Sequence, residues 1–450
     1  MEYVALVLRQ LKVQKVALAV DPKAAARVFQ VPKRNGNQRE VWDGGRLTRA
    51  AQRPPPPPYL ANPGALAELE ASHDLPLWMS GRDAESFFDQ LALPAELQPF
   101  FGRPFVTVTE LLTGTDSEAP LPSLDAVRQH LVQDHCIDAD SELCPVSRVW
   151  PMGFGWSSFV AQSVMIDTLI AAKFLPGQFL TEEGALPLPG MSCVSIATDD
   201  VIHFQRASPM QAEQLVSPLA RLDEEWRSRG LISQPSKSFD LESDGVCLGV
   251  ELVSGTCLAP KASRLSDIMC AIIALMRHPW ASPGQVASLL GMLQWNDLMS
   301  RGLLSIFSSA YAFTRLLPEN ECVVVWPSVV SELALNVALC CFWVTDLTRP
   351  WWPFIVSTDA SSSYGFGMTI ASLPPDQVRA AASAAGSSST YFRLASDPPD
   401  SKMRPRRGTC YRLPLRARDF KTVLSIRARL SPGFFLVQIE KMMWIMHSWR

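Results

Sequence analysis

The sequence contains no CxxC pair, and its ten cysteines stand at irregular spacings. This pattern predicts neither a disulfide framework nor a zinc knuckle. The longest apolar stretches, near residues 265–277 and 333–345, are too short or too close to charges to cross a bilayer, and the N-terminus lacks a signal-peptide pattern. We therefore expect an intracellular, soluble protein of the cytoplasm or nucleus, with no membrane partner.

An excess of one charge is also missing, since 41 Lys and Arg stand against 44 Asp and Glu. A near-neutral chain is not expected to coat nucleic acid by bulk electrostatics. There is no Gly-rich phosphate loop, which argues against a phosphotransferase that binds its substrate through one. What is present is a 47% hydrophobic composition over 450 residues, enough for two or three packed domains. Basic residues are concentrated in 33–53 and 402–429, as solvated loops or as binding surfaces.

Local patterns predict an ordered set of elements. The first thirty residues favour a helix, and VFQVPKRNGNQREVWDGGRL (28–47) predicts a hairpin that turns at Asn35 and Gly36. Residues 54–64, with five consecutive prolines, predict an extended connector. Residues 260–317 are helical in pattern, with Ser282 as a cap before Pro283. FIVSTDASSSYGFGMTIA, from Phe354, predicts two strands and a new domain from about residue 350.

Two apolar runs end in carboxylates. LPLWMSGRD ends at Asp83, and MSCVSIATDD ends at Asp199 and Asp200. Carboxylate oxygens are preferred Mg²⁺ ligands, and phosphoryl transfer uses one cation to activate a hydroxyl and another to neutralise the leaving pyrophosphate. A pair of aspartates on its own more often caps a loop or helix. The acids indicate a two-ion site only if other features accompany them.

Such features occur in a fixed order along the chain. They are RDAESFFDQLALP (82–94), VWPMGFGWSSFVAQ (149–162), SIATDDVIHF (195–204), RGLISQPSKSF (229–239) and VCLGVEL (246–252). In order and approximate spacing they resemble the palm motifs of reverse transcriptases, and the resemblance extends over about residues 25–450. It implies an α+β right-hand polymerase with fingers, palm and thumb. The activity implied is that of an RNA-directed DNA polymerase, a nucleotidyltransferase of a retrotransposon.

The resemblance also assigns roles in the catalytic centre. Asp83, Asp199 and Asp200 would be the catalytic residues that bind two Mg²⁺ ions, with Mn²⁺ as an alternative. Phe88 would lie beneath the sugar and exclude a ribose 2′-hydroxyl, whereas RNA-dependent RNA polymerases usually carry a second aspartate there. Phe88 could instead be core packing, because Phe87 is adjacent and only one of the two can face the site.

Further residues would bind the substrates, which are deoxynucleoside triphosphates, an RNA template and a DNA primer or hybrid. The nucleotide-binding residues implied are Lys33, Arg39, Gly153, Gln162 and Lys237. Lys33 and Arg39 would clamp the triphosphate. Gly153 would let the backbone approach closely, and Gln162 would contact base or sugar. Lys237 would protonate the leaving pyrophosphate, or else be an exposed turn lysine.

The hairpin at Leu248, Gly249 and Val250 resembles the primer grip. Two departures from the family pattern are Ala197 and Ala84, beside the acids, and neither removes a metal ligand. The interval between Asp83 and Asp199 is long, which predicts an insertion around residues 110–145.

The last part of the chain resembles the start of ribonuclease H. In STDASSSYGFGM, Asp359 would bind metal, and Glu440, in a predicted amphipathic helix, would be a second ligand. The chain ends at Arg450 without counterparts for the remaining acids, which predicts a partial, inactive ribonuclease H-like α/β domain.

These expectations divide the chain into three parts. Residues 1–258 would form fingers and palm, 259–348 a mostly helical thumb or connection, and 349–450 the ribonuclease H-like part. The alternative function is a degenerate or domesticated retroelement fragment that binds nucleic acid without catalysis.

Overall fold

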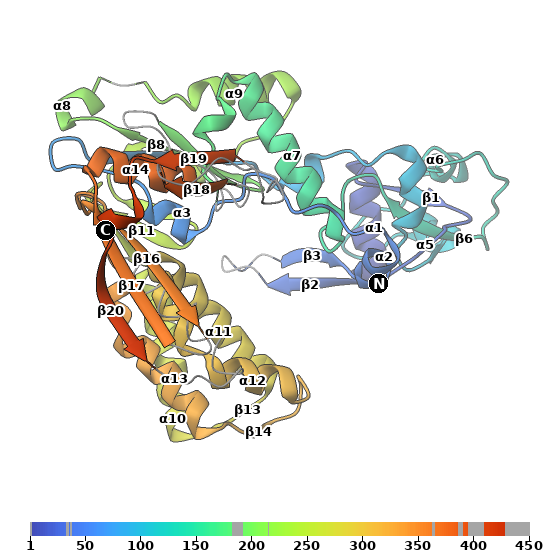
Figure 1. Ribbon diagram of the computed structural model, residues 1–450. Coiled ribbons are helices and arrows are strands. Elements are labelled where there is room, and N and C mark those ends of the chain that lie inside the picture. Colours follow the sequence, from blue (N-terminus) through green and yellow to red (C-terminus); the bar gives the residue numbers. More distant parts are fainter. Residues whose placement is uncertain are drawn as a thin grey trace, which may run out of the picture.

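The structure, a computed structural model, describes residues 2–32, 36, 38–181, 192–214, 216–361, 365–385, 390–394 and 409–427. The chain mixes helices with several small sheets rather than building one continuous sheet. A central sheet connects a lobe formed largely by the chain start with a helical lobe, and a further antiparallel sheet follows at the other end of the chain (Figure 1).

The N-terminal lobe combines the chain start with residues 106–147. Its elements are α1 (Glu2–Lys12), β1 (Val16–Ala19), β5 (Val106–Thr107), α5 (Val108–Thr113), α6 (Leu124–Arg128) and β6 (Glu142–Ser147). The sheet order is β1-β6-β5, and Val7, Leu8, Val127 and Leu143 meet in its core. The predicted helix over the first thirty residues is therefore right for α1 and wrong for β1, which is drawn into a strand by antiparallel pairing with β6.

The predicted hairpin at residues 28–47 is confirmed as strands β2 (Val28–Pro32) and β3 (Gln38–Trp42), which pair antiparallel. The turn residue Asn35 lies outside the described residues. The hairpin projects from the N-terminal lobe towards the helical lobe (Figure 1). At its base follows the short helix α2 (Gly45–Ala50). The predicted connector at residues 54–64 has no strand, and a short helix, α3 (Pro63–Ala67), begins at its end.

The central sheet has the order β7-β8-β4-β9. Its strands are β4 (Leu77–Asp83), β7 (Cys193–Ala197), β8 (Asp200–Arg206) and β9 (Phe239–Glu242). Helices α7 (Gly155–Ala171) and α9 (Ala220–Arg229) pack on one face, where Ala161, Met165, Val201, Leu222 and Trp226 are buried together. Short helices α4 (Phe87–Gln90) and α8 (Pro209–Ala212) follow β4 and β8. The opposite face is also covered, because Met79, Cys193 and Phe204 are buried in a second core with Leu252 and Leu258.

A second sheet and the helical lobe share one core. The strands are β10 (Gly245–Cys247), β11 (Val250–Val253), β12 (Cys257–Pro260) and β15 (Thr345–Asp346). The helices are α10 (Ala262–Arg277), α11 (Pro283–Asp297), α12 (Ser308–Leu316) and α13 (Pro327–Ala338), with the small ladder β13 (Trp280–Ala281) and β14 (Val323–Val324). Leu252 and Leu258 pack with Ile268 and Leu293, so the core continues across residue 258. The predicted cap is confirmed, because Ser282 forms a capping box with Gln285.

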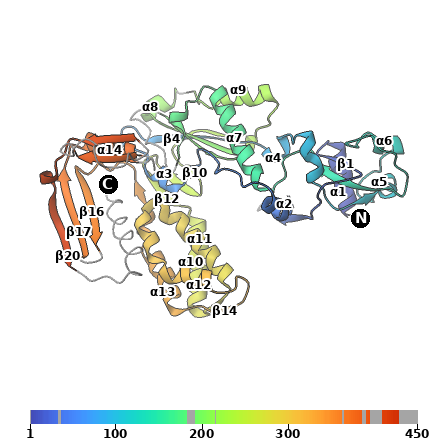
Figure 2. The same ribbon diagram turned by 45° about the vertical axis from the view of Figure 1, so that its right-hand side comes forward.

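The C-terminal strands form two further sheets (Figure 2). β16 (Phe354–Ser361), β17 (Gly365–Ser372) and β20 (Lys421–Arg427) are antiparallel, while β18 (Thr390–Leu394) and β19 (Thr409–Leu413) pair parallel beside α14 (Pro375–Ala385). The two strands predicted from Phe354 are confirmed as β16 and β17. Within the described part of the chain, no helix has the length and apolar character needed to span a bilayer.

Candidate active site

The central sheet brings the three predicted acids together. Asp83 is the last residue of β4 and lies directly opposite Asp200, the first residue of β8. Asp199 belongs to the two-residue turn between β7 and β8, because Ala197 pairs with Asp200. The Ala84 amide donates to the Asp199 carbonyl oxygen at 3.0 Å, which ties this turn to the end of β4. Residues more than a hundred positions apart therefore present carboxylates at one sheet end.

Like charges directly opposite one another in a ladder are destabilising. Burial, followed by repulsion from Asp83, raises the pKa of Asp199 above its usual value. Asp200 is exposed at the start of β8. Partial desolvation, a hydrogen bond with Asp83 and repulsion from both neighbours raise the pKa of Asp200 to about 7. The three carboxylates thus repel one another, and a cation nearby would reduce this repulsion.

Lys237 is the cation nearest to this cluster for which an ion pair is seen. It lies in a 3₁₀ turn (Pro235–Lys237), and its Nζ donates to Asp83 Oδ2 at 2.5 Å. Partial burial lowers the pKa of Lys237, but the hydrogen bond and the charges of Asp83, Asp200 and Asp199 outweigh burial and raise it. Lys237 is therefore protonated, with its proton at the edge of the acid cluster.

In ligand chemistry the three carboxylates suit magnesium, because they supply the hard oxygen ligands that this ion prefers. Among the described residues, however, no group of three or more His, Cys, Asp or Glu side chains is arranged so as to hold a metal ion. Asp83 is engaged by Lys237 and by Asp200 instead. Ion binding would require these two contacts to open.

Arg82, for which no role was predicted, holds this region together from the other face of the sheet. Its Nε donates to Asp223 Oδ1 at 2.8 Å, and its two terminal nitrogens donate to the two carboxylate oxygens of Asp240 at 3.0 and 3.1 Å. Arg82 is only 7% exposed. The fork joins β4 to α9 and β9. A charged residue inside the otherwise apolar strand LWMSGRD was the signal that could have identified it.

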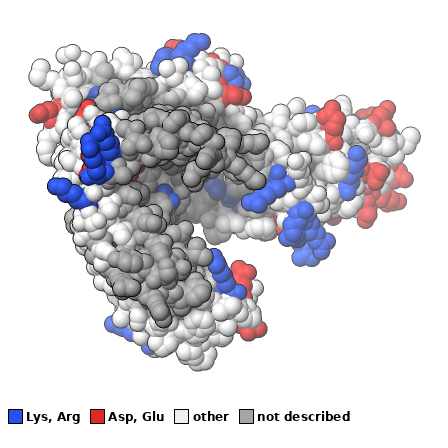
Figure 3. Space-filling view, viewed as in Figure 1, with Lys and Arg blue, Asp and Glu red and all other residues white. Residues whose placement is uncertain are grey.

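The hairpin of β2 and β3 contributes positive charge near the acids. Arg39, exposed on β3, is close enough for its charge to lower the pKa of Asp199, against the larger effect of burial. Lys33 lies outside the described residues. Lys and Arg side chains also gather over α2 at the base of the hairpin (Figure 3). The hairpin thus brings the positive charge of Arg39 within electrostatic range of Asp199.

Phe87 and Phe88 differ in burial. Phe87 is 1% exposed and belongs to the core beneath the sheet, whereas Phe88 is half-buried and packs against the edge of that core. Of the two adjacent rings, Phe88 is therefore the one with an accessible part that could face the site.

Gly153 lies against the hairpin base rather than in open space. Its φ is +113°, and a Cβ there would stand 2.0 Å from the Trp42 carbonyl oxygen. The Trp42 amide donates to the Met152 carbonyl oxygen at 3.0 Å. The glycine is required for this backbone contact, which positions the hairpin beside the start of α7.

Gln162 lies differently from the expectation that it contacts base or sugar. Its side chain is fully buried in α7 and is hydrogen-bonded within the protein. It has no accessible surface with which to contact a nucleotide. Its amide group is hydrogen-bonded beneath the β7–β8 turn instead.

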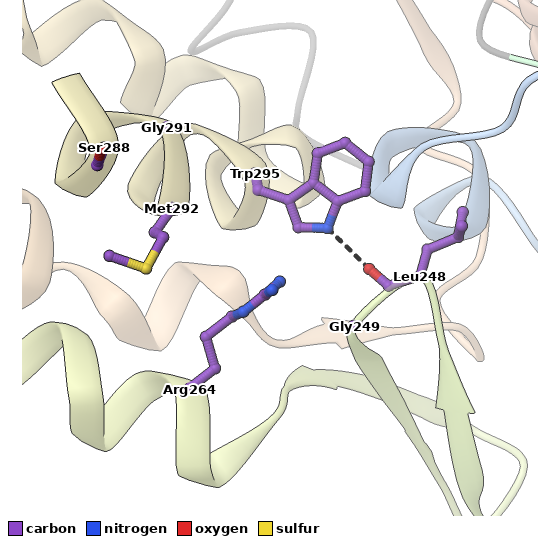
Figure 4. Close-up of a pocket in the computed structure, with 7 residues that line it drawn as sticks. All are labelled: Leu248, Gly249, Arg264, Ser288, Gly291, Met292 and Trp295. Atoms are coloured by element: carbon purple, nitrogen blue, oxygen red, sulfur yellow. Dashed lines mark hydrogen bonds between the residues drawn. The ribbon is translucent and has the colours of Figure 1, made fainter. Parts of the chain in front are cut away.

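The predicted primer grip is a tight hairpin turn. Leu248 (φ +52°) and Gly249 (φ +78°) connect Cys247 to Val250, and both positive φ values suit a two-residue hairpin. Val250 is buried, so only the turn itself is presented. Trp295 Nε1 donates to the Leu248 carbonyl oxygen at 2.7 Å, which fixes the turn to α11 (Figure 4).

A hollow of about 420 Å³ opens beside this turn. Its lining comes from the turn and from α10 and α11 (Figure 4): Leu248, Gly249, Arg264, Ser288, Gly291, Met292 and Trp295. Arg264 supplies the one cationic side chain of this lining, and its guanidinium lies where a Cβ on Gly249 would meet it at 2.8 Å.

Of the two predicted ribonuclease H ligands, one lies within the described part of the chain. Asp359 lies on β16, opposite Gly367 of β17, in a sheet separate from that of Asp83. Glu440 lies outside the described residues, as does the helix predicted to carry it.

No family model matches the sequence, and no curated protein matches it either. Among solved structures, the chain is similar to foamy viral protease-reverse transcriptase. In a dRH form in complex with ds DNA the identity is 14%, the TM-score is 0.46, and the similarity covers 81% of this chain and 51% of the other. For the structure in complex with dsDNA the identity is 14% and the TM-score is 0.46, and the similarity covers 81% of this chain and 61% of the other. For the structure in complex with RNA/DNA hybrid the identity is 14% and the TM-score is 0.47, and the similarity covers 79% of this chain and 39% of the other. The chain thus spans about half the length of the first of these proteins.

Proposed function

We propose that the protein is an RNA-directed DNA polymerase of a retrotransposon, which adds deoxynucleotides to a primer 3′ end. The observation that carries this proposal is the juxtaposition of Asp83 with Asp199 and Asp200 across β4 and β8. Paired carboxylates with raised pKa values, within electrostatic range of Arg39, suit chemistry on a nucleoside triphosphate bound with magnesium.

Asp83, Asp199 and Asp200 would hold Mg²⁺, which when bound lowers the pKa of the attacking 3′-hydroxyl and neutralises the pyrophosphate. The surrounding residues have their own tasks. Arg39, with Lys33, binds the triphosphate oxygens. Lys237 holds a proton at the edge of the site, where it can be given to the leaving pyrophosphate. Phe88 presents a ring that excludes the 2′-hydroxyl of a ribonucleotide.

The turn at Leu248 and Gly249 would hold the primer terminus, and the adjoining hollow with Arg264 offers a guanidinium to a backbone phosphate. The nucleic-acid partners proposed are an RNA template and a DNA primer. For residues 349–450 we keep the proposal of a partial ribonuclease H-like domain without its own activity.

One observation favours a second candidate function, nucleic-acid binding without catalysis. Asp83 is engaged by Lys237 and Asp200, and no described group of acids is arranged as a metal site. A degenerate copy of the enzyme would keep such a closed cluster.

Primer extension separates the two candidates. The full chain is incubated with poly(rA) annealed to oligo(dT), dTTP and Mg²⁺, and wild type is compared with Asp199→Asn. Asp125→Asn, at a highly exposed position on α6, is the matched control because its side chain is 81% exposed. Extension by wild type and control, but not by Asp199→Asn, supports the polymerase. Hybrid binding by all three without extension would instead support the binding protein.

A further inference from the structure

The β7–β8 turn that carries Asp199 has a strained backbone. Thr198 adopts φ +61°, in the left-handed region. A β-branched residue there is disfavoured by contacts of its Cβ, and such conformations persist only where surrounding groups hold them. The turn therefore needs support from outside its own two strands.

Gln162 provides that support from α7. Its Oε1 accepts a hydrogen bond from the Thr198 backbone amide at 2.8 Å. Its Nε2 donates to the carbonyl oxygens of Pro58 at 3.0 Å, Ile196 at 3.4 Å and Tyr59 at 3.5 Å. One buried amide thus joins the helix, the proline-rich connector, the end of β7 and the turn.

The side chain of Gln162 is fully buried in a largely apolar core. A buried amide in such a place is stable only when its donor and acceptor groups are paired, and both are. Removal would leave the Thr198 amide and the Pro58 carbonyl without partners, at a cost that is local to the turn. Among the described residues, no other group accepts a hydrogen bond from the Thr198 amide.

We infer that Gln162 is a positioning residue that holds the Thr198–Asp199 turn so that Asp199 and Asp200 face Asp83. The inference rests on the proposed function, because it concerns the same carboxylate cluster. It differs from the sequence expectation in that Gln162 acts through the protein backbone and not through the nucleotide. Partners that orient metal ligands typically change metal affinity or activity about 10–100-fold when removed.

The test compares Gln162→Met, which has similar length but no hydrogen bonds, with Gln162→Glu, which keeps an oxygen towards the Thr198 amide. Thr168→Val is the matched control. Thr168 is also fully buried in α7 and is hydrogen-bonded to Met165 and Trp226, but it does not contact the turn. Binding of Mn²⁺ to the full chain with primer and template is measured by electron paramagnetic resonance, together with hybrid affinity and thermal unfolding.

We expect Gln162→Met to weaken Mn²⁺ binding about 10–100-fold with hybrid affinity unchanged, and Gln162→Glu to restore most of it. Thr168→Val should lower thermal stability without weakening Mn²⁺ binding. Wild-type Mn²⁺ affinity in Gln162→Met would overturn the positioning role and leave the proposed function intact. Absence of Mn²⁺ binding in wild type would overturn the proposed function, and the inference with it.

A measurement on wild type alone covers the case in which Gln162→Met does not fold. Hydrogen exchange resolved at Thr198 should show an amide protected well beyond those of exposed turns, because its acceptor is buried. Exchange as fast as in an exposed turn would overturn the inference.

Discussion

The ammonium group of Lys237 donates a 2.5 Å hydrogen bond to a carboxylate oxygen of Asp83. The two side chains differ sharply in exposure, 56% for Lys237 and 5% for Asp83. An accessible turn lysine is thereby attached to the most buried acid of the candidate site. In the proposed polymerase, the lysine would move between the free cluster and a bound triphosphate.

Lys237→Met should lower the rate of primer extension about 100-fold, the lower end of what a positioned proton donor contributes. Methionine keeps the length of the side chain and removes both charge and proton. Lys237→Arg keeps the charge but gives up its proton far less readily. Single-turnover extension measures both variants. Full activity in Lys237→Arg would contradict proton donation and favour charge neutralisation alone.

Arg82→Met should lower the free energy of unfolding by about 2 kcal/mol, because Asp223 and Asp240 lose a shared, buried partner. Arg82→Lys should have a free energy of unfolding between those of wild type and Arg82→Met, since one ammonium group cannot bind both carboxylates. Urea denaturation measures the change. Arg229→Met is the control, because Arg229 forms an exposed helix pair with Glu225 that is worth only about 0.3–0.5 kcal/mol. Equal losses in both variants would contradict the clamp.

Gly153→Ala should destabilise the protein by about 2 kcal/mol or more, because its Cβ would collide with the Trp42 carbonyl oxygen at a positive φ. The hairpin that carries Arg39 should shift, and KM for dTTP should rise in primer extension. At Gly177 a Cβ meets nothing within 4 Å, so Gly177→Ala should stay within about 0.5 kcal/mol of wild type. An unchanged KM for dTTP in Gly153→Ala would contradict the idea that Gly153 positions the hairpin.

Asp297 gives the helical lobe a pH dependence. It is fully buried and accepts hydrogen bonds from Trp343 Nε1 at 2.7 Å and Asn336 Nδ2 at 3.0 Å. Burial nevertheless raises the pKa of Asp297 to about 6. Because the folded value exceeds the unfolded one, its stabilising contribution is fully present below about pH 4 and is lost as the pH rises through about 6.

Asp297→Asn removes this titration. Asn336 Oδ1 has no partner in the described structure and, after an amide flip, can accept from the new side-chain amide. The free energy of unfolding of wild type minus that of Asp297→Asn should therefore fall by about 2–3 kcal/mol between pH 4 and pH 7. Urea denaturation across this range measures the difference, and a flat difference would contradict the raised pKa.

Local patterns predicted much of what lies around the acids. The hairpin at residues 28–47, the strand that ends at Asp83 and the Ser282 cap follow from alternation and capping, which act between near neighbours. The apolar runs also predicted that Asp83, Asp199 and Asp200 lie at strand ends, while their joint role in a site stays a prediction that rests on the family resemblance. Asp200, however, begins β8 instead of ending β7.

What the sequence did not reveal depends on long-range packing. Val16–Ala19 form a strand only because β6, more than a hundred residues later, pairs with them. The burial of Gln162 requires Pro58, Thr198 and α7 to meet, and no local signal marks that meeting. A motif position was visible in the sequence, but its contacts were not.

Metal-directed cleavage of the chain tests the central claim most directly. Fe²⁺ is bound in place of Mg²⁺ in the presence of primer, template and dTTP, and peroxide then produces hydroxyl radicals that cut the backbone close to the ion. If these three acids bind the ion, wild type should be cut beside Asp83 and at the Thr198–Asp199 turn, and Asp200→Asn should lose these cuts with hybrid binding intact. Cuts only at other positions, or the same cuts in Asp200→Asn, would contradict a metal site formed by these three acids.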